Sequence, residues 1–134
     1  MIRKHTKGSA LLAVLLLMTI TVAMLSNFFR SFSLTTDLIF KRQRRMQRKY
    51  LAHGTLYYGL SLCKKHYKTL QEKVELDLGA FLIDGFLTHH IYLVVTPKKK
   101  TIEVKATLRY EGERVYEVCC TLENSFITKW SEQV

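Results

Sequence analysis

The sequence contains 134 residues, and its 21 Lys and Arg residues outnumber its 11 Asp and Glu residues, which gives a net charge of +10. Residues 1–49 hold ten of the basic residues and one acidic residue, Asp37, whereas residues 50–134 hold eleven basic and ten acidic residues. The almost neutral second part argues against a basic nucleic-acid-binding domain, and the length leaves room for one small domain only.

The first predicted element is a transmembrane helix over 9–29, which begins directly after Lys7 and Gly8. Its 21 consecutive uncharged residues span about 31 Å at the rise of an α-helix, which matches the hydrocarbon core of a bilayer. The charge excess near this segment points to the membrane neighbourhood.

A cleaved secretory signal is the alternative interpretation of this segment, because Arg3, Lys4 and Lys7 would form its basic n-region. The apolar run of such a signal ends at a small-residue cleavage site after about 7 to 15 residues. Here the run continues past Thr21-Val22-Ala23, which is a poor cleavage site, so a retained helix is favoured.

The helical pattern continues beyond the apolar run, because no proline occurs before Pro97 and no glycine occurs between Gly8 and Gly54. A rotation of about 100° per residue gathers six basic side chains on one face of this helix. This basic face consists of Lys41, Arg42, Arg44, Arg45, Arg48 and Lys49. It is either a solvated surface or a site for anionic lipid, acidic neighbours or DNA phosphates.

An apolar stripe at intervals of three and four residues follows, and it predicts that the helix packs on a sheet. The stripe consists of Ala52, Leu56, Leu60, Cys63, Tyr67 and Leu70. We expect one helix from about residue 9 to about residue 70. A bend is plausible at Gly54 and Gly59, because each glycine costs about 1 kcal/mol in a helix interior.

The remaining sequence predicts an antiparallel sheet. Apolar and polar residues alternate over 91–96, 102–111 and 116–123, with turn signals at 97–100 and 111–113, and a last short strand is expected within 126–130. The segment 74–86 stays ambiguous, because its apolar residues fit neither period and two glycines interrupt it. The predicted fold class is therefore α+β, a long N-terminal helix packed on a three- to four-stranded antiparallel sheet.

The three cysteines, Cys63, Cys119 and Cys120, lack the spacing of a zinc site, so neither a metal nor another cofactor is expected. Buried free thiols are favoured, and one disulfide, for which Cys63 and Cys120 are the candidates, is the alternative in an oxidising compartment.

Taken together, these features resemble a type IV pilin-like protein, either a minor pilin or a minor pseudopilin of type II secretion. The resemblance rests on the basic leader with Lys7-Gly8, the uncharged run that starts at Ser9, its helical continuation and the small β domain. It implies a leader over 1–8, a transmembrane helix over 9–29, a helix with the basic face over 30–70 and a β domain over 71–134. It further implies cleavage between Gly8 and Ser9 by a prepilin peptidase and methylation of Ser9.

The resemblance also implies the partners and the location of the chain. Partners would be other pilin or pseudopilin subunits, the peptidase, an inner-membrane assembly platform and membrane lipid, with DNA as a less favoured partner. The chain would cross the bacterial inner membrane once, with the β domain in the periplasm. Major pilins carry Glu at the fifth mature position, which is Ala13 here, so the SALLAVLLL opening resembles the subunits at filament tips. The block YLAHGTLYYGLSL at 50–62 is similar to a block in those subunits.

A second interpretation is a single-pass anchored protein whose basic helix binds anionic lipid or nucleic acid in the cytoplasm. Three Lys and Arg residues precede the apolar run and seven occur in the twenty residues after it, a bias that would keep the β domain inside. An enzyme is not expected, because no nucleophile elbow, phosphate loop or H-E-x-x-H motif is present. The adjacent His89 and His90 would point to opposite faces of a strand and could not share one site.

Overall fold

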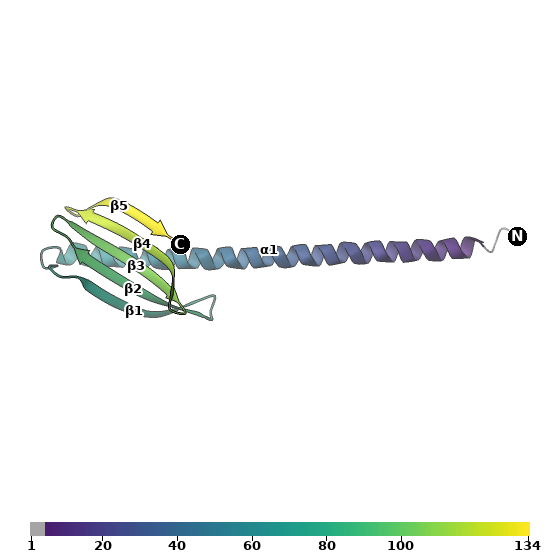
Figure 1. The fold of residues 1–134 in the computed structure, drawn as a ribbon, viewed down its shortest axis with the longest axis horizontal. Helices are drawn as coiled ribbons and strands as arrows, with labels where there is room; N and C mark the ends of the chain where they lie inside the picture. Colours follow the sequence, from purple (N-terminus) through teal and green to yellow (C-terminus); the bar gives the residue numbers. More distant parts are fainter. Residues whose placement is uncertain (1–4) are drawn as a thin grey trace. The chain divides into compact units, whose positions relative to one another are not determined.

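The computed structural model of the protein describes residues 5–134. Within them, the helix α1 (His5–His66) precedes a sheet of five strands (Figure 1). The strands are β1 (Val74–Ile83), β2 (Leu87–Pro97), β3 (Thr101–Tyr110), β4 (Glu113–Glu123) and β5 (Phe126–Gln133). The chain divides into two compact units, one that ends at Arg42 and one from Gln43 to Val134.

The first unit is the N-terminal part of α1, and its side chains from Gly8 to Arg42 are almost all exposed. Threonine hydroxyls within it donate hydrogen bonds to backbone carbonyls of the preceding turn. Thr19 Oγ1 donates to Leu16 O at 2.8 Å, and Thr21 Oγ1 donates to Met18 O at 2.8 Å. These side chains therefore bring no unsatisfied hydroxyl into an apolar environment.

The second unit combines the C-terminal part of α1 with the sheet. The strand order β1-β2-β3-β4-β5 follows the chain, and each neighbouring pair is antiparallel. Three of the four connections are tight turns that contain residues with positive φ, namely Asp84-Gly85, Glu111-Gly112 and Asn124-Ser125. Such turns match the right-handed twist of the strands that they join.

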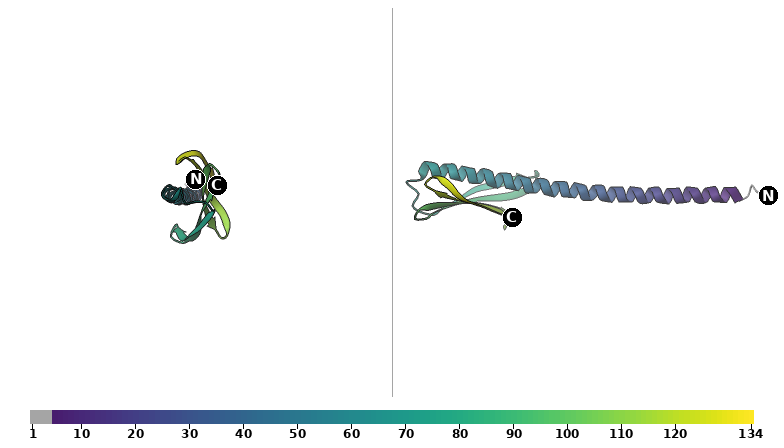
Figure 2. Two further views of the ribbon diagram at one scale, coloured as in Figure 1. Left: turned by 90° about the vertical axis from the view of Figure 1, so that its left-hand side faces the viewer. Right: turned by 90° about the horizontal axis from the view of Figure 1, so that it is seen from above.

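The core lies between the last turns of α1 and one face of the sheet (Figure 2). Four residues of the predicted helix stripe are buried, and they face alternate residues of the strands. The core consists of Ala52, Leu56, Leu60, Cys63, Ile83, Ile91, Leu93, Val95, Ile102, Val104, Ala106, Leu108, Tyr116, Val118, Cys120 and Leu122. The alternation predicted for β2, β3 and β4 is thus confirmed, since their alternating apolar residues lie on the face that packs against α1. Only one register places all of these apolar side chains on the same buried face.

The helix is continuous through both glycines at which a bend was expected. Gly59 instead allows a close approach, because a Cβ there would lie 2.8 Å from Leu93 Cδ1 and 2.9 Å from Val104 Cγ1. Gly54 has open space around its Cα. The helix ends at His66, whose carbonyl accepts hydrogen bonds from the N–H groups of Thr69 and Leu70.

The structure confirms the α+β class and corrects the strand number from three or four to five. The additional strand is β1, in the segment that the sequence left ambiguous. Its register shifts between Asp77 and Gly79, where Gly79 adopts φ of 91° and its N–H donates to Asp77 Oδ1 at 2.9 Å. This bulge moves the apolar residues after it out of step with those before it.

Candidate functional site

The apolar segment Ser9–Phe29 is the strongest functional feature of the first unit. Within the described residues, α1 is the one helix that is long and apolar enough to cross a membrane, by length and composition. Its large apolar side chains are exposed, from 46% for Ile20 to 68% for Leu12 and Met24. The segment thus has no protein core to cover it and is suited to lipid or to neighbouring helices.

The predicted processing residues, Gly8 and Ser9, both lie in α1 and are exposed. A Cβ at Gly8 would meet nothing within 4 Å, so the fold itself does not require a glycine there. Part of the predicted leader, residues 1–4, lies outside the described residues. Cleavage after Gly8 stays a prediction.

The basic face predicted on the helix is partly engaged by the sheet. Arg44 Nε donates to Asp84 Oδ2 at 2.5 Å, and the guanidinium lies 5.6 Å from the centre of the Phe86 ring. Gln47 Oε1 accepts from the backbone N–H of Asp84 at 3.2 Å. These contacts fix the turn between β1 and β2 against α1.

Arg48 makes the most buried of these contacts. Its Nε donates to His89 Nε2 at 2.9 Å, and His89 Nδ1 lies 3.1 Å from the carbonyl oxygen of Leu87. Because the guanidinium can only donate, His89 is the neutral tautomer with its proton on Nδ1. The His89 side chain has no exposed surface, and burial together with the Arg48 charge lowers its pKa.

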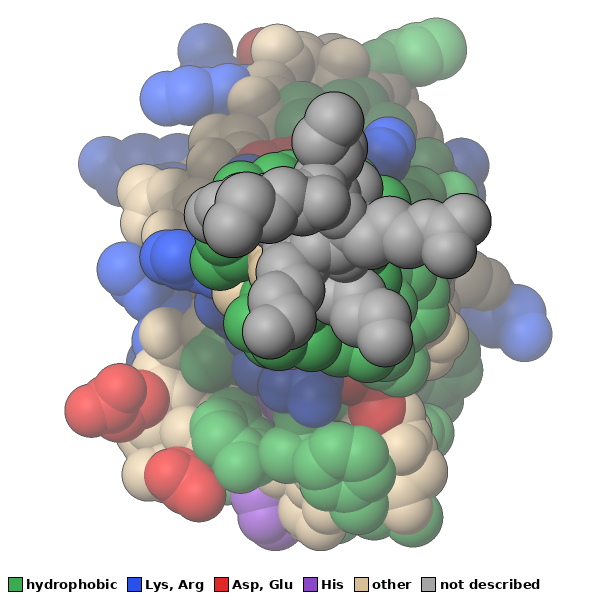
Figure 3. All heavy atoms as spheres, turned by 90° about the vertical axis from the view of Figure 1, so that its right-hand side faces the viewer, with side chains coloured by type: hydrophobic (Ala, Val, Ile, Leu, Met, Phe, Trp, Pro, Cys, Tyr) green, Lys and Arg blue, Asp and Glu red, His purple; other side chains and the backbone are tan. Residues whose placement is uncertain are grey.

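The other members of the basic face differ in their surroundings. Lys41 Nζ lies 2.8 Å from Asp37 Oδ2, and Lys49 Nζ lies 3.6 Å from Glu132 Oε2. Arg42 and Arg45 are exposed. Viewed from the N-terminal end, Lys and Arg side chains occur on both sides and form no continuous patch in this view (Figure 3). The fold therefore uses several of the six basic residues for its own ion pairs.

Glu132 of β5 is a second centre of polar contacts that the sequence did not indicate. Its carboxylate accepts hydrogen bonds from Tyr116 Oη at 2.7 Å and from Trp130 Nε1 at 3.2 Å. His53 Nε2 of α1 lies 2.9 Å from Glu132 Oε1 without the alignment of a hydrogen bond, and the His53 ring packs 5.3 Å from the Trp130 ring.

Burial and the Glu132 carboxylate raise the pKa of Tyr116 to about 12, so the phenol remains the donor. The hydrogen bond from Tyr116 in turn lowers the pKa of Glu132. The contacts of Glu132 and Trp130 with α1 hold β5 beside the helix, although β5 is an exposed strand in which Trp130 retains 36% of its surface.

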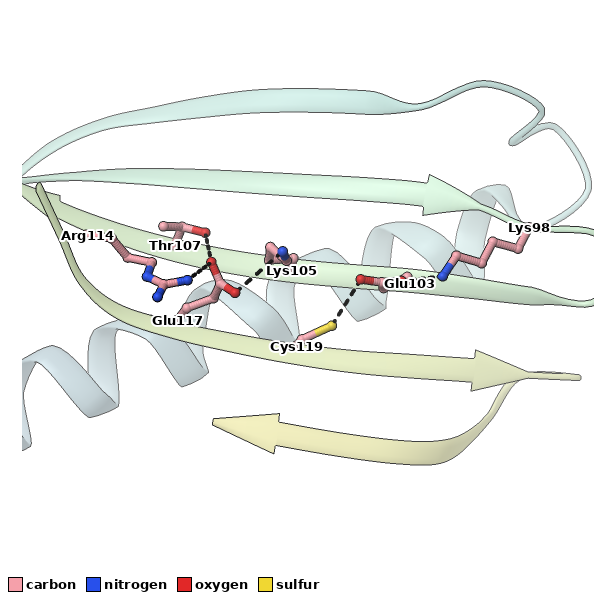
Figure 4. A network of polar contacts seen from close by, with 7 residues as sticks. All are labelled: Lys98, Glu103, Lys105, Thr107, Arg114, Glu117 and Cys119. Atoms are coloured by element: carbon pink, nitrogen blue, oxygen red, sulfur yellow. Dashed lines mark hydrogen bonds and ion pairs between the residues drawn. The ribbon is translucent and has the colours of Figure 1, made fainter. Parts of the chain in front are cut away.

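The sheet face opposite α1 carries a polar network (Figure 4). Glu117 lies 3.4 Å from Lys105 Nζ and 3.5 Å from an Arg114 nitrogen, and it accepts a hydrogen bond from Thr107 at 3.3 Å. Lys105, Thr107, Arg114 and Glu117 also line a hollow of about 620 Å³ over β1 to β4. The charges in this hollow neutralise one another, so it favours no particular ligand charge.

The thiol of Cys119 belongs to the same face. Cys119 Sγ donates to Glu103 Oε1 at 3.4 Å, and Lys98 Nζ donates to Glu103 Oε2 at 2.6 Å. Burial and the Glu103 carboxylate raise the pKa of Cys119 to about 11. A protonated thiol at neutral pH is a poor nucleophile.

Cys63 and Cys120, the candidates for a disulfide, both lie in the core, one from α1 and one from β4. The structure has all three cysteines as free thiols. Burial raises the pKa of both Cys63 and Cys120, and the nearby Cys120 raises the pKa of Cys63 further. Both side chains fill space in the core in this state.

The adjacent His89 and His90 lie on opposite faces of β2, as their positions in a strand predict. His89 is buried and His90 is exposed. Among residues 5–134, no group of three His, Cys, Asp or Glu side chains could hold a metal ion. The sequence did not indicate the contacts of Asp84 and Glu132, which lie 40 and 83 residues from their helix partners Arg44 and Lys49. Pairs so far apart in the chain produce no local sequence pattern.

No protein-family model, no curated protein and no solved structure matches the chain.

Proposed function

We propose that the protein is a minor pilin or pseudopilin, a structural or initiating subunit of a type IV pilus-like or type II secretion filament. In this proposal a prepilin peptidase removes residues 1–8, and the chain that begins at Ser9 assembles with other subunits on an inner-membrane platform. The β domain then lies in the periplasm. No catalysis by the chain is required.

One observation carries the proposal: a helix that is uncharged and exposed over Ser9–Phe29 continues without a break into a helix that forms the core of a five-stranded antiparallel unit. This is the architecture that the resemblance implies. Because the first part buries nothing by itself, it needs lipid before assembly and neighbouring helices after it. Small residues, such as Ser9, Ala10, Ala13 and Ala23, would allow these helices to approach closely.

Ala13 supports a particular place in the filament. A carboxylate within an apolar helix is costly unless a positive charge meets it, and the resemblance assigns that role to Glu at this position in major pilins. Ala13 carries no charge and needs no such neighbour. A subunit at the tip, which has no subunit above it, fits this sequence best.

Mass spectrometry of the mature N-terminus tests the proposal. A chain that begins at methylated Ser9 supports it, and replacement of Gly8 by Val is expected to leave the leader attached. A mature chain that begins at Met1 or Met24 contradicts it. The Gly8→Val substitution is sterically open, so loss of processing would not result from misfolding.

The alternative function is that of a cytoplasm-facing anchor that binds anionic lipid or nucleic acid through the basic face. The basic residues after the apolar run favour it, but Arg44 and Arg48 already bind the sheet. Protease treatment of intact spheroplasts separates the two functions. Digestion of the β domain is expected for the filament subunit, and protection of the β domain supports the anchor.

A further inference from the structure

Seven lysines gather at one end of the second unit. They belong to two segments that are distant in the sequence: residues 64–73 include the end of α1 and the link to β1, and residues 98–100 connect β2 to β3. The antiparallel order of the strands brings both segments to the end of the sheet where α1 ends (Figure 1). We call this group the lysine end, and it consists of Lys64, Lys65, Lys68, Lys73, Lys98, Lys99 and Lys100.

The charges of this unit are separated rather than mixed. The two segments hold seven of the eleven basic residues of 50–134 but only one of its ten acidic residues, Glu72. The turns at the other end of the sheet carry Asp84 and Glu111 instead. A domain that is almost neutral as a whole thus presents a positive surface at one end. Such a surface is the electrostatic signature of a site for a polyanion.

The fold makes little use of the charges at the lysine end. Lys73 Nζ lies 2.6 Å from Glu75 Oε1, and Lys98 Nζ lies 2.6 Å from Glu103 Oε2. In the described part of the chain, the other five lysines have no ion-pair partner, and all seven residues are exposed. Positive charge complements the dipole at the C-terminus of a helix, but this effect is confined to the last turn of α1. Because crowded like charges repel one another, an anion from outside would stabilise this end.

We propose that the lysine end binds double-stranded DNA through the phosphates of its backbone. A lysine ammonium is a compact point charge, and duplex DNA offers one negative charge per about 1.7 Å of its axis, so two lysine segments can contact several phosphates at once. The lysine end contains no Arg, which is the residue that most often reads guanine in the major groove. We therefore expect binding that does not depend on the DNA sequence. This inference goes beyond the proposed function.

Two other anionic partners fit the lysine end less well. Interfaces between proteins are depleted in Lys and enriched in Arg and aromatic residues, so an acidic protein is disfavoured. A polybasic anchor for the membrane of the chain itself would flank the apolar segment, whereas Lys64 follows Phe29 by 35 residues. An acidic protein and an anionic membrane are the alternatives that the experiment separates from DNA.

Fluorescence anisotropy of a short labelled duplex, with the full chain in nanodiscs of phosphatidylcholine, measures the binding. If each of the five unpaired lysines contacts a phosphate, the logarithm of the affinity should fall with the logarithm of the salt concentration with a slope of about −4.5. The affinity should then fall about 500-fold between roughly 50 and 200 mM salt. Two duplexes of unrelated sequence are expected to bind within about twofold of each other.

Paired substitutions with glutamine locate the site. One pair is Lys99→Gln with Lys100→Gln, and the other is Lys65→Gln with Lys68→Gln, so each pair removes two charges from one segment. Each pair is expected to lower the affinity at low salt by about tenfold or more and to reduce the magnitude of the salt slope by about 2. Substitution of the same residues by Arg keeps the charge and is expected to restore both quantities.

The matched control is Arg109→Gln with Arg114→Gln, which removes two exposed charges near the other end of the sheet. Salt screens charges over about 10 Å, so this pair should change the affinity by less than about twofold. Arg42→Gln with Arg45→Gln removes two exposed charges of the basic face and should likewise preserve binding.

The inference is overturned if the chain does not bind the duplex at low salt, or if either of these Arg pairs weakens binding as much as the lysine pairs do. Tighter binding to poly-glutamate would overturn it in favour of an acidic protein, and tighter binding to phosphatidylglycerol vesicles would overturn it in favour of lipid. DNA binding by a chain that begins at Met1 would keep this inference and contradict the filament proposal. A chain that begins at methylated Ser9 and does not bind DNA would do the reverse.

Discussion

His89 is the residue whose chemistry the fold constrains most strongly. Its imidazole is enclosed between the Arg48 guanidinium and the Leu87 carbonyl, and the Tyr110 ring stacks on it with centroids 5.0 Å apart. Arg48 is the charged group that acts on this imidazole, whereas Arg44 and Asp84 act on Arg48, and Glu111 acts on Tyr110. A proton on Nε2 would abolish the hydrogen bond from Arg48 and place two positive charges side by side. The unit is therefore built on a neutral histidine.

We expect acid to destabilise the unit through His89. The pKa of His89 in the folded state lies below its ordinary value of 6.5. At a pH between these two pKa values, the unfolded chain binds more protons than the folded chain. The stabilisation is complete above pH 6.5 and is lost as the pH falls below it. Denaturant unfolding followed by the fluorescence of Trp130 measures the slope.

The slope of stability against pH between pH 7.5 and 5 should be smaller in the His89→Gln chain than in the parent. His90→Gln, at the exposed neighbour on the other face of the strand, is the matched control and should retain the parent slope. Equal slopes in all three chains would show that His89 does not titrate with unfolding.

Substitution with glutamine can separate the residues of the basic face that stabilise the fold from those that do not. Arg48→Gln leaves the buried His89 nitrogen without its donor and is expected to cost about 1–3 kcal/mol of unfolding free energy. Arg44→Gln removes a partly exposed ion pair and is expected to cost about 1 kcal/mol. Arg42→Gln, at an exposed position, should change the stability by less than about 0.5 kcal/mol. Equal changes in unfolding free energy for all three variants would contradict this ranking.

The cysteines permit a direct count. We expect alkylation of the denatured chain under non-reducing conditions to modify three thiols, since Cys63 and Cys120 fill the core as thiols. Modification of a single thiol would instead show that two cysteines are paired, and Cys63 and Cys120 are the candidates for that disulfide. Prior reduction of the sample provides the reference count.

At the scale of elements, the part of α1 that belongs to the second unit contains two glycines with different physical roles, Gly54 and Gly59. Gly59 lies against Leu93 and Val104 of the sheet, where there is no space for a methyl group, and Gly54 faces open space. Helix propensity alone treats the two positions as equivalent. Only the position of the sheet distinguishes them.

Alanine substitutions should therefore have opposite effects. Gly59→Ala is expected to lower the unfolding free energy by about 1–3 kcal/mol, because the added methyl group overpacks the core. Gly54→Ala is expected to raise it by about 1 kcal/mol through helix propensity. Thermal unfolding of the two variants beside the parent checks this. A stabilising effect of both substitutions would show that the sheet can give way at Gly59.

Elements with a strict period were predictable from the sequence, and elements that break the period were not. In β3, the alternation from Ile102 to Leu108 continues without a bulge, so its buried face could be assigned residue by residue. In β1, the bulge at Gly79 interrupts the alternation, and Phe81 and Leu82 are exposed on an edge. Without a consistent burial pattern the strand resembled a loop.

The end of β5 was missed for a different reason. The prediction stopped at Trp130, whereas the strand continues to Gln133. Residues Ser131 to Gln133 have low β-propensity, and their pairing with β4 is supported by Glu132, which binds Tyr116 and Trp130. A carboxylate that stabilises a strand through partners far away in the chain produces no local sequence pattern from which the strand could be predicted.

At the scale of the whole molecule, the chain consists of a unit without a core and a unit with one. The sequence predicts a helix over 30–70 that packs on a β domain over 71–134, and in the structure the helix from Gln43 onward forms one compact unit with the sheet. The reason is the buried face of α1, since Ala52, Leu56 and Leu60 complete the core. A sheet with one apolar face needs this cover.

A fragment that begins at Gln43 should therefore fold by itself. We expect circular dichroism to show helix and sheet and denaturant to unfold it in a single transition, since it retains the entire core. A second fragment, from Lys73, lacks the helix and should give no cooperative transition. A non-cooperative first fragment would show that the apolar segment contributes to the stability of the unit.

The nearest-neighbour order of the sheet bears on how the molecule is made. Each strand pairs with the one synthesised just before it, and α1 precedes them all. Every loop that must close is short, so its entropic cost is small and pairing is fast. The hairpins can thus be added one after another while the chain is still being delivered from the ribosome or through a translocation channel, and no early strand has to wait unpaired for a distant partner.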